Sequence, residues 1–377
     1  MKKILRNKSI LTGKNKLEQL YEFKKFPVFM GCVDNLDDKN DINVDMSFSI
    51  CRDTGIIQLD ELLPLDLIYQ NQHNDGVGKI WQEHYVSFAK FLEKFNPKEV
   101  LEIGGANDFI ANYYLERNPK TTWTIIEPHP LFKNKKIKII KRWFDESFVL
   151  KSKKIDTIMH SHVLEHTYEP IKFIKHIAKF SEEGSRHIFT IPNMVEQLSR
   201  KYTNCLNFEH TLFLAEPFID YILRINGFKI LKKSYFQDHS IFYATEKIKL
   251  NKEKITLPKK YSQYKKLFSE FVKYHQDLIN SLNKKIDKFD GDIYLFGAHI
   301  FSQYLLEFGL NKKKIKGILD NSDLKNGKRL YGTNLIVKKP ETLKGRKNVA
   351  IILKVGAYRN EIIKQVKKIN PNIVIFE

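Results

Sequence analysis

The sequence predicts an α/β protein: a parallel sheet with helices on both faces, ended by an antiparallel strand pair and followed by a second, smaller α/β unit. Short β-rich runs alternate with helical patterns between residues 99 and 191, which is typical of parallel sheets with helical crossovers. Two further runs, Lys229–Tyr235 and Ser240–Thr245, are separated by only a short connection. Such a connection favours antiparallel pairing at the end of the sheet.

Four segments follow one another along the chain. Residues 1–78 show no sustained hydrophobic period, which predicts a loop-rich N-terminal module. Residues 79–247 contain the core sheet, and residues 248–290 combine a Lys-dense linker, broken by Pro258, with a long amphipathic helix. Residues 291–377 again alternate strand-like and helical patterns. We therefore expect a core and a C-terminal domain joined by a linker and a helix.

Each element of the two α/β units has its own signal. The core begins with apolar side chains at helical spacing from residue 79 to Asn96-Pro97, where a helix should end. A second helix, Glu216–Ile225, is closed by Gly227. The expected core strands are Glu99–Ile103, Thr122–Ile126, Ile137–Ile140, Ile155–Met159 and Arg186–Ile191. In the second unit we expect strands Asp292–Phe296, Ile315–Leu319, Val349–Leu353 and Ile373–Phe376, with helices ending near Leu310 and starting near Glu361.

The charge of the chain is strongly positive but carried mainly by lysine. The 377 residues hold 64 Lys and Arg against 44 Asp and Glu, a net charge of +20, and only 10 of the basic residues are Arg. Proteins that bind nucleic acid rely on Arg for bidentate contacts. We therefore expect a solvated Lys-rich surface rather than a nucleic-acid groove, although this surface can attract an anionic small molecule.

The cysteines and the first residues exclude other classes of protein. Cys32, Cys51 and Cys205 lie far apart without a C-x-x-C pair, so neither a disulfide framework nor a four-cysteine zinc site is expected. The first 20 residues are basic but lack an apolar core, and no run approaches 18 apolar residues. We expect a cytoplasmic protein without a membrane span.

The clearest chemical signal lies at the end of the first core strand. There the sequence reads Glu102-Ile103-Gly104-Gly105-Ala106-Asn107-Asp108 and continues as a helix. Glycines at such a turn let the backbone approach a ligand and direct helix N-terminal amides at it. A second acid, Glu127, ends the next strand, where a carboxylate can accept hydrogen bonds from ribose hydroxyls. The order of these residues on consecutive strands favours a nucleotide-type cofactor site.

This arrangement resembles class I S-adenosylmethionine-dependent methyltransferases, whose first motif reads roughly Glu/Asp-x-Gly-x-Gly-x-Gly. The run Ile155-Asp156 to Val163-Leu164-Glu165-His166 is similar to the fourth strand of that fold and its continuation. The resemblance implies a Rossmann-like core and S-adenosyl-L-methionine as cofactor. By the same resemblance Glu102 belongs to the cofactor site, and Gly104 and Gly105 approach the methionine part of the cofactor. Glu127 would bind the ribose, Phe144 and Asp145 would lie near the adenine, and His160 and His162 would border the methyl group.

A narrower likeness covers the whole chain. The order resembles the three-part sugar C-methyltransferases of nucleotide-linked deoxysugars, which carry a zinc-binding N-terminal module and a Rossmann-like C-terminal domain. The stretches that carry it are Cys51-Arg52-Asp53-Thr54-Gly55, Asn207-Phe208-Glu209-His210 and Phe296-Gly297-Ala298. Where that family has a second cysteine, this chain has Thr54. A structural zinc ion needs about four ligands, so we expect no metal here.

By this resemblance Glu209 and His210 are the catalytic residues. A histidine beside a carboxylate suits removal of one proton, because imidazole titrates near neutral pH and the carboxylate can orient it. Asn207 stands where the family has tyrosine, which makes an oxygen or nitrogen acceptor easier to support than a carbon acceptor. The expected substrate is a small, anionic, nucleotide-linked sugar.

Two other functions remain open on the sequence. A non-catalytic protein that binds a nucleotide or a partner would explain the departures from the motifs at Ala106, Asp108, Thr54 and Asn207. An RNA methyltransferase would explain the positive charge.

Overall fold

A seven-stranded sheet forms the middle of the protein, in the order β12-β13-β11-β10-β7-β8-β9. The computed structural model describes residues 4–69, 78–150, 155–250 and 254–377. The five strands from β7 to β11 pair in parallel, whereas β13 is antiparallel to both of its neighbours. The strands are β7 Glu99–Ile103, β8 Thr122–Ile126, β9 Ile137–Ile140, β10 Thr157–Ser161, β11 Arg186–Pro192, β12 Phe228–Phe236 and β13 Ser240–Lys247.

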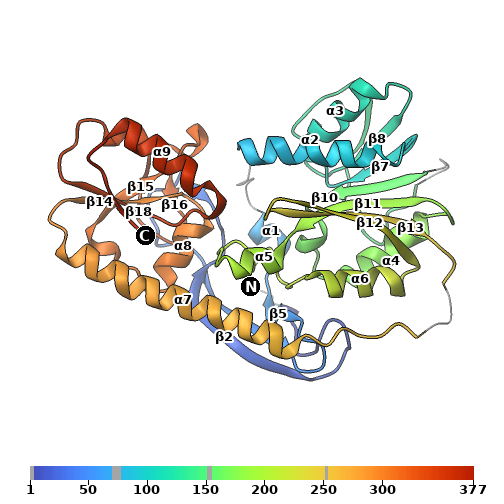
Figure 1. The fold of residues 1–377 in the computed structure, drawn as a ribbon, viewed down its shortest axis with the longest axis horizontal. Coiled ribbons are helices and arrows are strands. Elements are labelled where there is room, and N and C mark those ends of the chain that lie inside the picture. The colour runs from blue at the N-terminus through green and yellow to red at the C-terminus, as the bar shows by residue number, and fades with distance from the viewer. Residues whose placement is uncertain (1–3, 70–77, 151–154, 251–253) are drawn as a thin grey trace.

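Helices cover both faces of this sheet (Figure 1). On one face α2 and α3 pack against each other, and on the opposite face lie α4 and α6. Apolar spacing explains the burial, since α2 contributes Phe88, Phe91 and Leu92 to one cluster and α4 contributes Ile174 and Ile177 to the other. The helices are α2 Lys79–Glu93, α3 Phe109–Arg117, α4 Pro170–Phe180, α5 Met194–Ser199 and α6 Glu216–Ile225, with a 3-10 turn at Leu164–His166.

The predicted fold class is confirmed, and most core strands begin and end where the sequence places them. β10 differs, because it runs from Thr157 to Ser161 instead of Ile155–Met159. The side chain of Asp156 accepts backbone N–H bonds from Lys98 and Glu99, at 2.8 and 3.2 Å. Asp156 therefore caps the start of β7, and its own strand begins one residue later.

The N-terminal segment is more regular than the loop-rich module that the sequence suggests. β2 and β4 are long antiparallel strands, and β5 extends them to a three-stranded sheet. The pairing of β2 with β4 shifts register twice, and Lys25 has a φ of +54°. These bulges interrupt the two-residue alternation by which a strand is recognised. The elements are β1 Ile4–Leu5, β2 Leu17–Pro27, β3 Cys32–Val33, β4 Asn43–Cys51, β5 Ile57–Leu59, β6 Glu61–Leu62 and α1 Leu65–Ile68.

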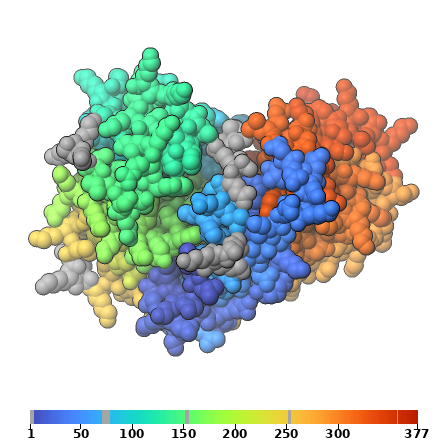
Figure 2. All heavy atoms as spheres, turned by 180° about the vertical axis from the view of Figure 1, so that it is seen from behind, coloured from blue at the N-terminus to red at the C-terminus, as the bar shows by residue number. Residues whose placement is uncertain are grey.

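This segment lies between the core and the C-terminal domain (Figure 2). Its strand β5 continues onto the core, because Leu59 N–H donates to Thr211 O at 2.8 Å and Phe213 N–H to Ile57 O at 2.9 Å. On the other side β3 pairs with β16 of the C-terminal domain. One hydrophobic cluster accordingly includes side chains from all three parts of the chain.

The C-terminal domain contains a five-stranded parallel sheet in the order β17-β15-β14-β18-β19. The long helix α7 leads into it and packs against β2 and β4 (Figure 1). Its strands and helices are α7 Tyr261–Lys288, β14 Asp292–Phe296, α8 Ile300–Glu307, β15 Ile315–Leu319, β16 Arg329–Leu330, β17 Val337–Lys338, β18 Val349–Leu353, α9 Arg359–Ile369 and β19 Val374–Phe376. Four 3-10 turns, at Lys312–Lys314, Asp323–Lys325, Pro340–Leu343 and Gly356–Tyr358, complete it.

We expect Gly55→Ala to destabilise the protein, because Gly55 lies where the β4–β5 hairpin contacts the start of α7. Its φ is +86°, and a Cβ there would lie 2.4 Å from the carbonyl carbon of Lys260. Gly13→Ala is the matched control, since Gly13 has a φ of +67° but no atom within 4 Å. Thermal and urea unfolding should show Gly55→Ala to be about 1–3 kcal/mol less stable than Gly13→Ala. Equal losses for the two variants would contradict the close contact.

Candidate active site

The turn after β7 is built around two glycines in crowded positions. Gly104 has a φ of +76°, and a Cβ there would lie 2.6 Å from Cγ2 of Val163. Its N–H donates to Ile126 O at 2.9 Å, which joins the turn to the end of β8. At Gly105 an added Cβ would lie 3.0 Å from both the carboxyl carbon of Glu102 and Cγ2 of Ile125. Gly104 therefore requires glycine, Gly105 leaves little room for a side chain, and Val163, two residues after β10, packs directly on the turn.

Glu102 lies beneath this turn, inside the sheet. Its Oε2 accepts a hydrogen bond from Nε1 of the buried Trp123, at 2.7 Å. Burial raises the pKa of Glu102 to about 7, because removal from water disfavours its charged form. Glu102 thus supports the turn from below by linking β7 to β8.

The residues that replace the later glycines of the motif bind the turn to the loop after β8. Oδ2 of Asp108 accepts hydrogen bonds from the side-chain amides of Asn112 and Asn134, at 2.7 and 2.9 Å. The carbonyl of Ala106 accepts the N–H of Leu131 at 3.0 Å. This network holds the turn without the missing glycines.

Glu127 follows β8 and is half-buried. Its Oε1 accepts the backbone N–H of His129 at 2.8 Å, and burial raises the pKa of its carboxyl group. No hydrogen bond reaches its Oε2 from the part of the chain that the structure describes. That oxygen is available to a hydroxyl group of a ligand.

Phe144 and Asp145, expected near the adenine, lie on the loop after β9. The ring of Phe144 packs against α4, with its centroid 4.7 Å from that of His176 and 5.8 Å from that of Phe173. Asp145 is exposed, and its Oδ1 accepts the N–H of Ser147 at 2.9 Å. Their role in binding adenine stays a prediction.

His160 and His162 are on the same strand end but have different surroundings. His160 is fully buried, with its Nε2 3.1 Å from Nε2 of His187 and its ring stacked on Phe189. His162 directly follows the last residue of β10 and has a φ of +53°. Its Nδ1 lies 2.9 Å from Oε1 of Glu165. The contacts of His160 are those of a packing residue, and its place beside the methyl group stays a prediction.

His210 and Glu209 meet a third side chain, His166. The rings of His166 and His210 are 4.7 Å apart, and Nδ1 of His166 lies 3.7 Å from Oε2 of Glu209. Nδ1 of His166 is also 2.8 Å from the hydroxyl of Tyr69. Burial lowers the pKa of His166 to about 4, so its ring is neutral at pH 7. The structure thus brings the two predicted catalytic residues together with His166 and Tyr69.

Asn207 fixes the geometry of this pair. Its Oδ1 accepts the backbone N–H groups of Glu209 and His210, at 2.7 and 2.9 Å. Nδ1 of His210 donates to the carbonyl of Asn204 at 3.0 Å. Because a neutral imidazole then carries its lone pair on Nε2, that atom is the one able to accept a proton.

The segment from His162 to His166 joins the two halves of the site. On one side of this segment, Val163 contacts Gly104. On the other side, the ring of His166 contacts the ring of His210. Sequence reasoning missed Tyr69, which lies 97 positions before its partner His166. The His-x-x-x-His spacing of His162 and His166 is the signal that could have indicated a pair of histidines at this strand end.

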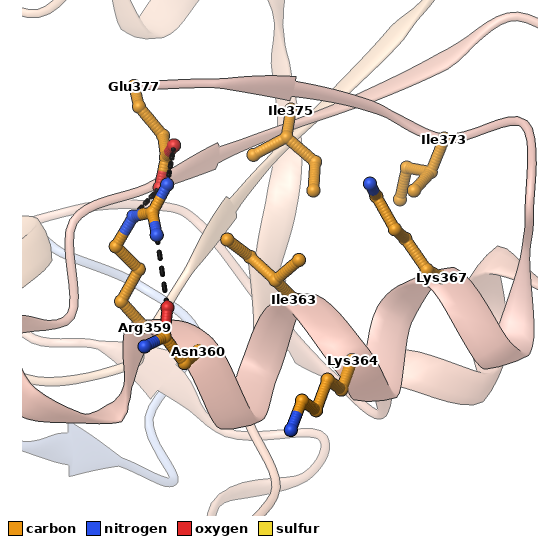
Figure 3. A pocket seen from close by; sticks show the side chains of 8 residues that line it. All are labelled: Arg359, Asn360, Ile363, Lys364, Lys367, Ile373, Ile375 and Glu377. Carbon is orange, nitrogen blue, oxygen red and sulfur yellow. Dashed lines mark hydrogen bonds and ion pairs between the residues drawn. The ribbon is translucent and has the colours of Figure 1, made fainter.

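A separate shallow pocket lies on the C-terminal domain, between α9 and β19 (Figure 3). Ile363 and Ile375 lie across from each other in it, and Arg359 forms an ion pair with Glu377 at 2.6 Å at one end. None of the predicted site residues lines this pocket. It is therefore not part of the candidate active site.

Two family models match the chain. One, described as a methyltransferase domain, matches residues 81–233. The other, described as a C-methyltransferase C-terminal domain, matches residues 239–375. The expected enzyme class is confirmed. No curated protein sequence is significantly similar to this chain.

Solved methyltransferase structures match less than half of this chain, at low sequence identity. An O-methyltransferase family protein from Burkholderia thailandensis is 15% identical over 45% of this chain and 57% of its own, with a TM-score of 0.37. The mitomycin 7-O-methyltransferase MmcR is 14% identical over 45% of this chain and 55% of its own, with a TM-score of 0.39. This chain thus spans little more than half of either structure. No helix among the described residues is long and apolar enough to cross a membrane.

We expect Glu102→Gln to change how stability depends on pH. The folded protein holds the pKa of Glu102 near 7, above the ordinary value of 4.5. The contribution of Glu102 to the free energy of unfolding is therefore fully present below pH 4.5 and is lost as the pH rises through 7. Between pH 4.5 and 8, wild type should lose up to about 3 kcal/mol more stability than Glu102→Gln.

The measurement is chemical unfolding at both pH values, with Glu116→Gln as the control. Glu116 is an exposed residue of α3, so the same chemical change should leave the pH dependence of wild type intact. Parallel stability profiles for wild type and Glu102→Gln would contradict the raised pKa.

Proposed function

We propose that this methyltransferase transfers the methyl group of S-adenosylmethionine to a small nucleotide-linked sugar. The observation that carries the proposal is the segment from His162 to His166, which places the Gly104 turn and the His210 cluster side by side. A cofactor site and a group able to accept a proton thus share one strand end. The match to a C-methyltransferase C-terminal domain supports methyl transfer as the reaction class.

The residues of the turn fit this cofactor in chemistry. Gly104 adopts a positive φ, a backbone conformation that residues with a side chain rarely take, in the strand-to-helix turn where a ligand would meet the backbone. Glu127 offers Oε2 to the ribose hydroxyls, as carboxylates at this position of a Rossmann-like sheet do. When bound, the cofactor supplies an electrophilic methyl group on a sulfonium centre.

His210 acts as the base in this proposal. Its Nδ1–H is held by the carbonyl of Asn204, so Nε2 accepts the proton of the acceptor group. Glu209 lies against the ring of His166, with its Oε2 3.7 Å from Nδ1 of that ring. Tyr69 holds the ring of His166 through its hydroxyl group. The cluster thus fixes the orientation of one base, His210, beside the ring of His166.

A sugar is proposed as the acceptor because the whole chain resembles the three-part sugar C-methyltransferases. Two features of the protein support a small anionic acceptor: a net charge of +20 and a second Rossmann-like sheet beside the core. The side chain that replaces the family's tyrosine, Asn207, is occupied by backbone N–H groups. An acceptor oxygen or nitrogen therefore suits this site better than a carbon acid, which needs a further group to stabilise its enolate.

We expect wild type to bind S-adenosylhomocysteine, and Glu127→Gln to bind it about ten- to a hundredfold more weakly. The reason is that a neutral amide replaces a charged acceptor for the ribose hydroxyls. Titration calorimetry measures both affinities, and Glu116→Gln on the exposed face of α3 should match wild type. Absence of binding by wild type up to millimolar concentration would contradict the proposed cofactor.

His210→Gln should lower turnover at least about a hundredfold and leave the affinity for S-adenosylhomocysteine unchanged, because the ring acts only on the acceptor proton. Formation of S-adenosylhomocysteine is followed with a panel of nucleotide-linked deoxysugars. His275→Gln, a change at a buried histidine of α7, is the control. Equal losses of turnover and cofactor affinity would show that His210 has a folding role instead.

A further inference from the structure

A second group of histidines lies on the other side of the His162–His166 segment. His84 comes from α2, His162 follows β10, and His239 lies in the turn between β12 and β13. Each offers a ring nitrogen, and the three nitrogens lie within 4.8 Å of one another. Three elements far apart in the sequence thus direct imidazole nitrogens at one point.

Hydrogen bonds orient two of these rings. Nδ1 of His162 lies 2.9 Å from the carboxylate of Glu165, whose side chain is fully buried. With its proton on Nδ1, His162 presents the lone pair of Nε2, which lies 2.9 Å from Oγ of Ser240. Nδ1 of His239 is 2.5 Å from the same hydroxyl. Ser240 Oγ therefore marks a point that both rings face.

A carboxylate on the far nitrogen of an imidazole is the usual support of a metal-binding histidine. It fixes the ring and makes the ligating nitrogen more basic. Glu165 holds His162 in this way. The buried pair His160 and His187 lacks this arrangement, because Nδ1 of neither ring has a hydrogen-bond partner among the described residues.

His84 adds an unsatisfied nitrogen. The residue is fully buried, and its Nε2 lies 3.2 Å from Oγ1 of Thr190. Its Nδ1 has no hydrogen-bond partner among the described residues. A buried polar atom without a partner is costly and calls for a ligand or a water molecule.

The cluster has an aromatic wall and an open side. The ring of Trp81 lies 5.4, 4.9 and 4.6 Å from the rings of His84, His162 and His239. His162 and His239 are half-buried, so both rings keep some contact with solvent. Imidazole nitrogens suit zinc and its neighbours among the transition metals, and three protein ligands leave one position open.

We propose that His84, His162 and His239 bind one divalent transition-metal ion of the Zn²⁺ class, with Glu165 as a positioning residue. The fourth position is filled by water or by Ser240 Oγ. This site is separate from the cysteine-based module whose missing ligands led us to expect no metal. Its residues were not recognisable as a set, because they are separated by 78 and 77 positions.

The test uses the full chain after chelator treatment, titrated with Co²⁺ and followed by visible absorption, and then with Zn²⁺ in competition. We expect one ion with a tetrahedral spectrum whose binding depends on His239. His239→Gln should weaken binding at least about tenfold, and Glu165→Gln about ten- to a hundredfold. His275→Gln and His210→Gln should keep the wild-type affinity.

Absence of binding would overturn the proposal, and so would an affinity that His239→Gln leaves unchanged. Loss of the ion in His210→Gln but not in His239→Gln would assign it to Glu165, His166 and His210 instead. X-ray absorption of zinc-loaded wild type needs no variant. It should show about three nitrogen ligands at about 2.0–2.1 Å, and sulfur ligands at about 2.3 Å would refute the site.

Discussion

The contact between Val163 and Gly104 is the constraint on which the candidate site depends. The chain leaving β10 passes so close to the turn after β7 that a Cβ on Gly104 would lie 2.6 Å from the valine side chain. Because the two strands are neighbours in the sheet, this approach fixes where the next residues lie. His162 is directed to one side of the turn, and Glu165 and His166 follow within one 3-10 turn. The histidine groups on both sides of the segment depend on that placement.

The N-terminal segment supports the site from the opposite direction. Its strand β5 is hydrogen-bonded to Thr211 and Phe213, directly after His210. Arg6 adds a bond from Nη1 to Thr211 O at 3.2 Å. On its other side, the fully buried Arg329 of the C-terminal domain bonds Asp41 through both terminal nitrogens. A buried charge pair of this kind is strongly destabilising to break. The segment therefore holds the His210 cluster and the C-terminal domain in one packed unit.

The sequence predicts well what neighbouring residues decide. Strands β7 and β8 and helix α6 follow from apolar runs bounded by turn residues, and so does the placement of Glu102 and Glu127 at the ends of two neighbouring parallel strands. The role of these two residues toward a cofactor stays a prediction. The sequence predicts poorly what distant residues decide. The bulges of β2 disrupt its alternation, and Tyr69 meets His166 only after the N-terminal segment has packed on the core. In the sequence, His84 looks like any packing residue of α2. Its partners in the cluster, His162 and His239, come from a strand end and a turn that lie far away along the chain.

The three tryptophans give the protein a set of built-in optical reporters. Trp123 is 1% exposed and bonded to Glu102, Trp81 lies among the three histidines, and the side chain of Trp143 is on the surface, 55% exposed. Indole emission shifts to shorter wavelength in a dry environment and is quenched by nearby charged or paramagnetic groups. Single-tryptophan variants would therefore allow the sheet interior, the histidine group and the loop after β9 to be followed separately by fluorescence.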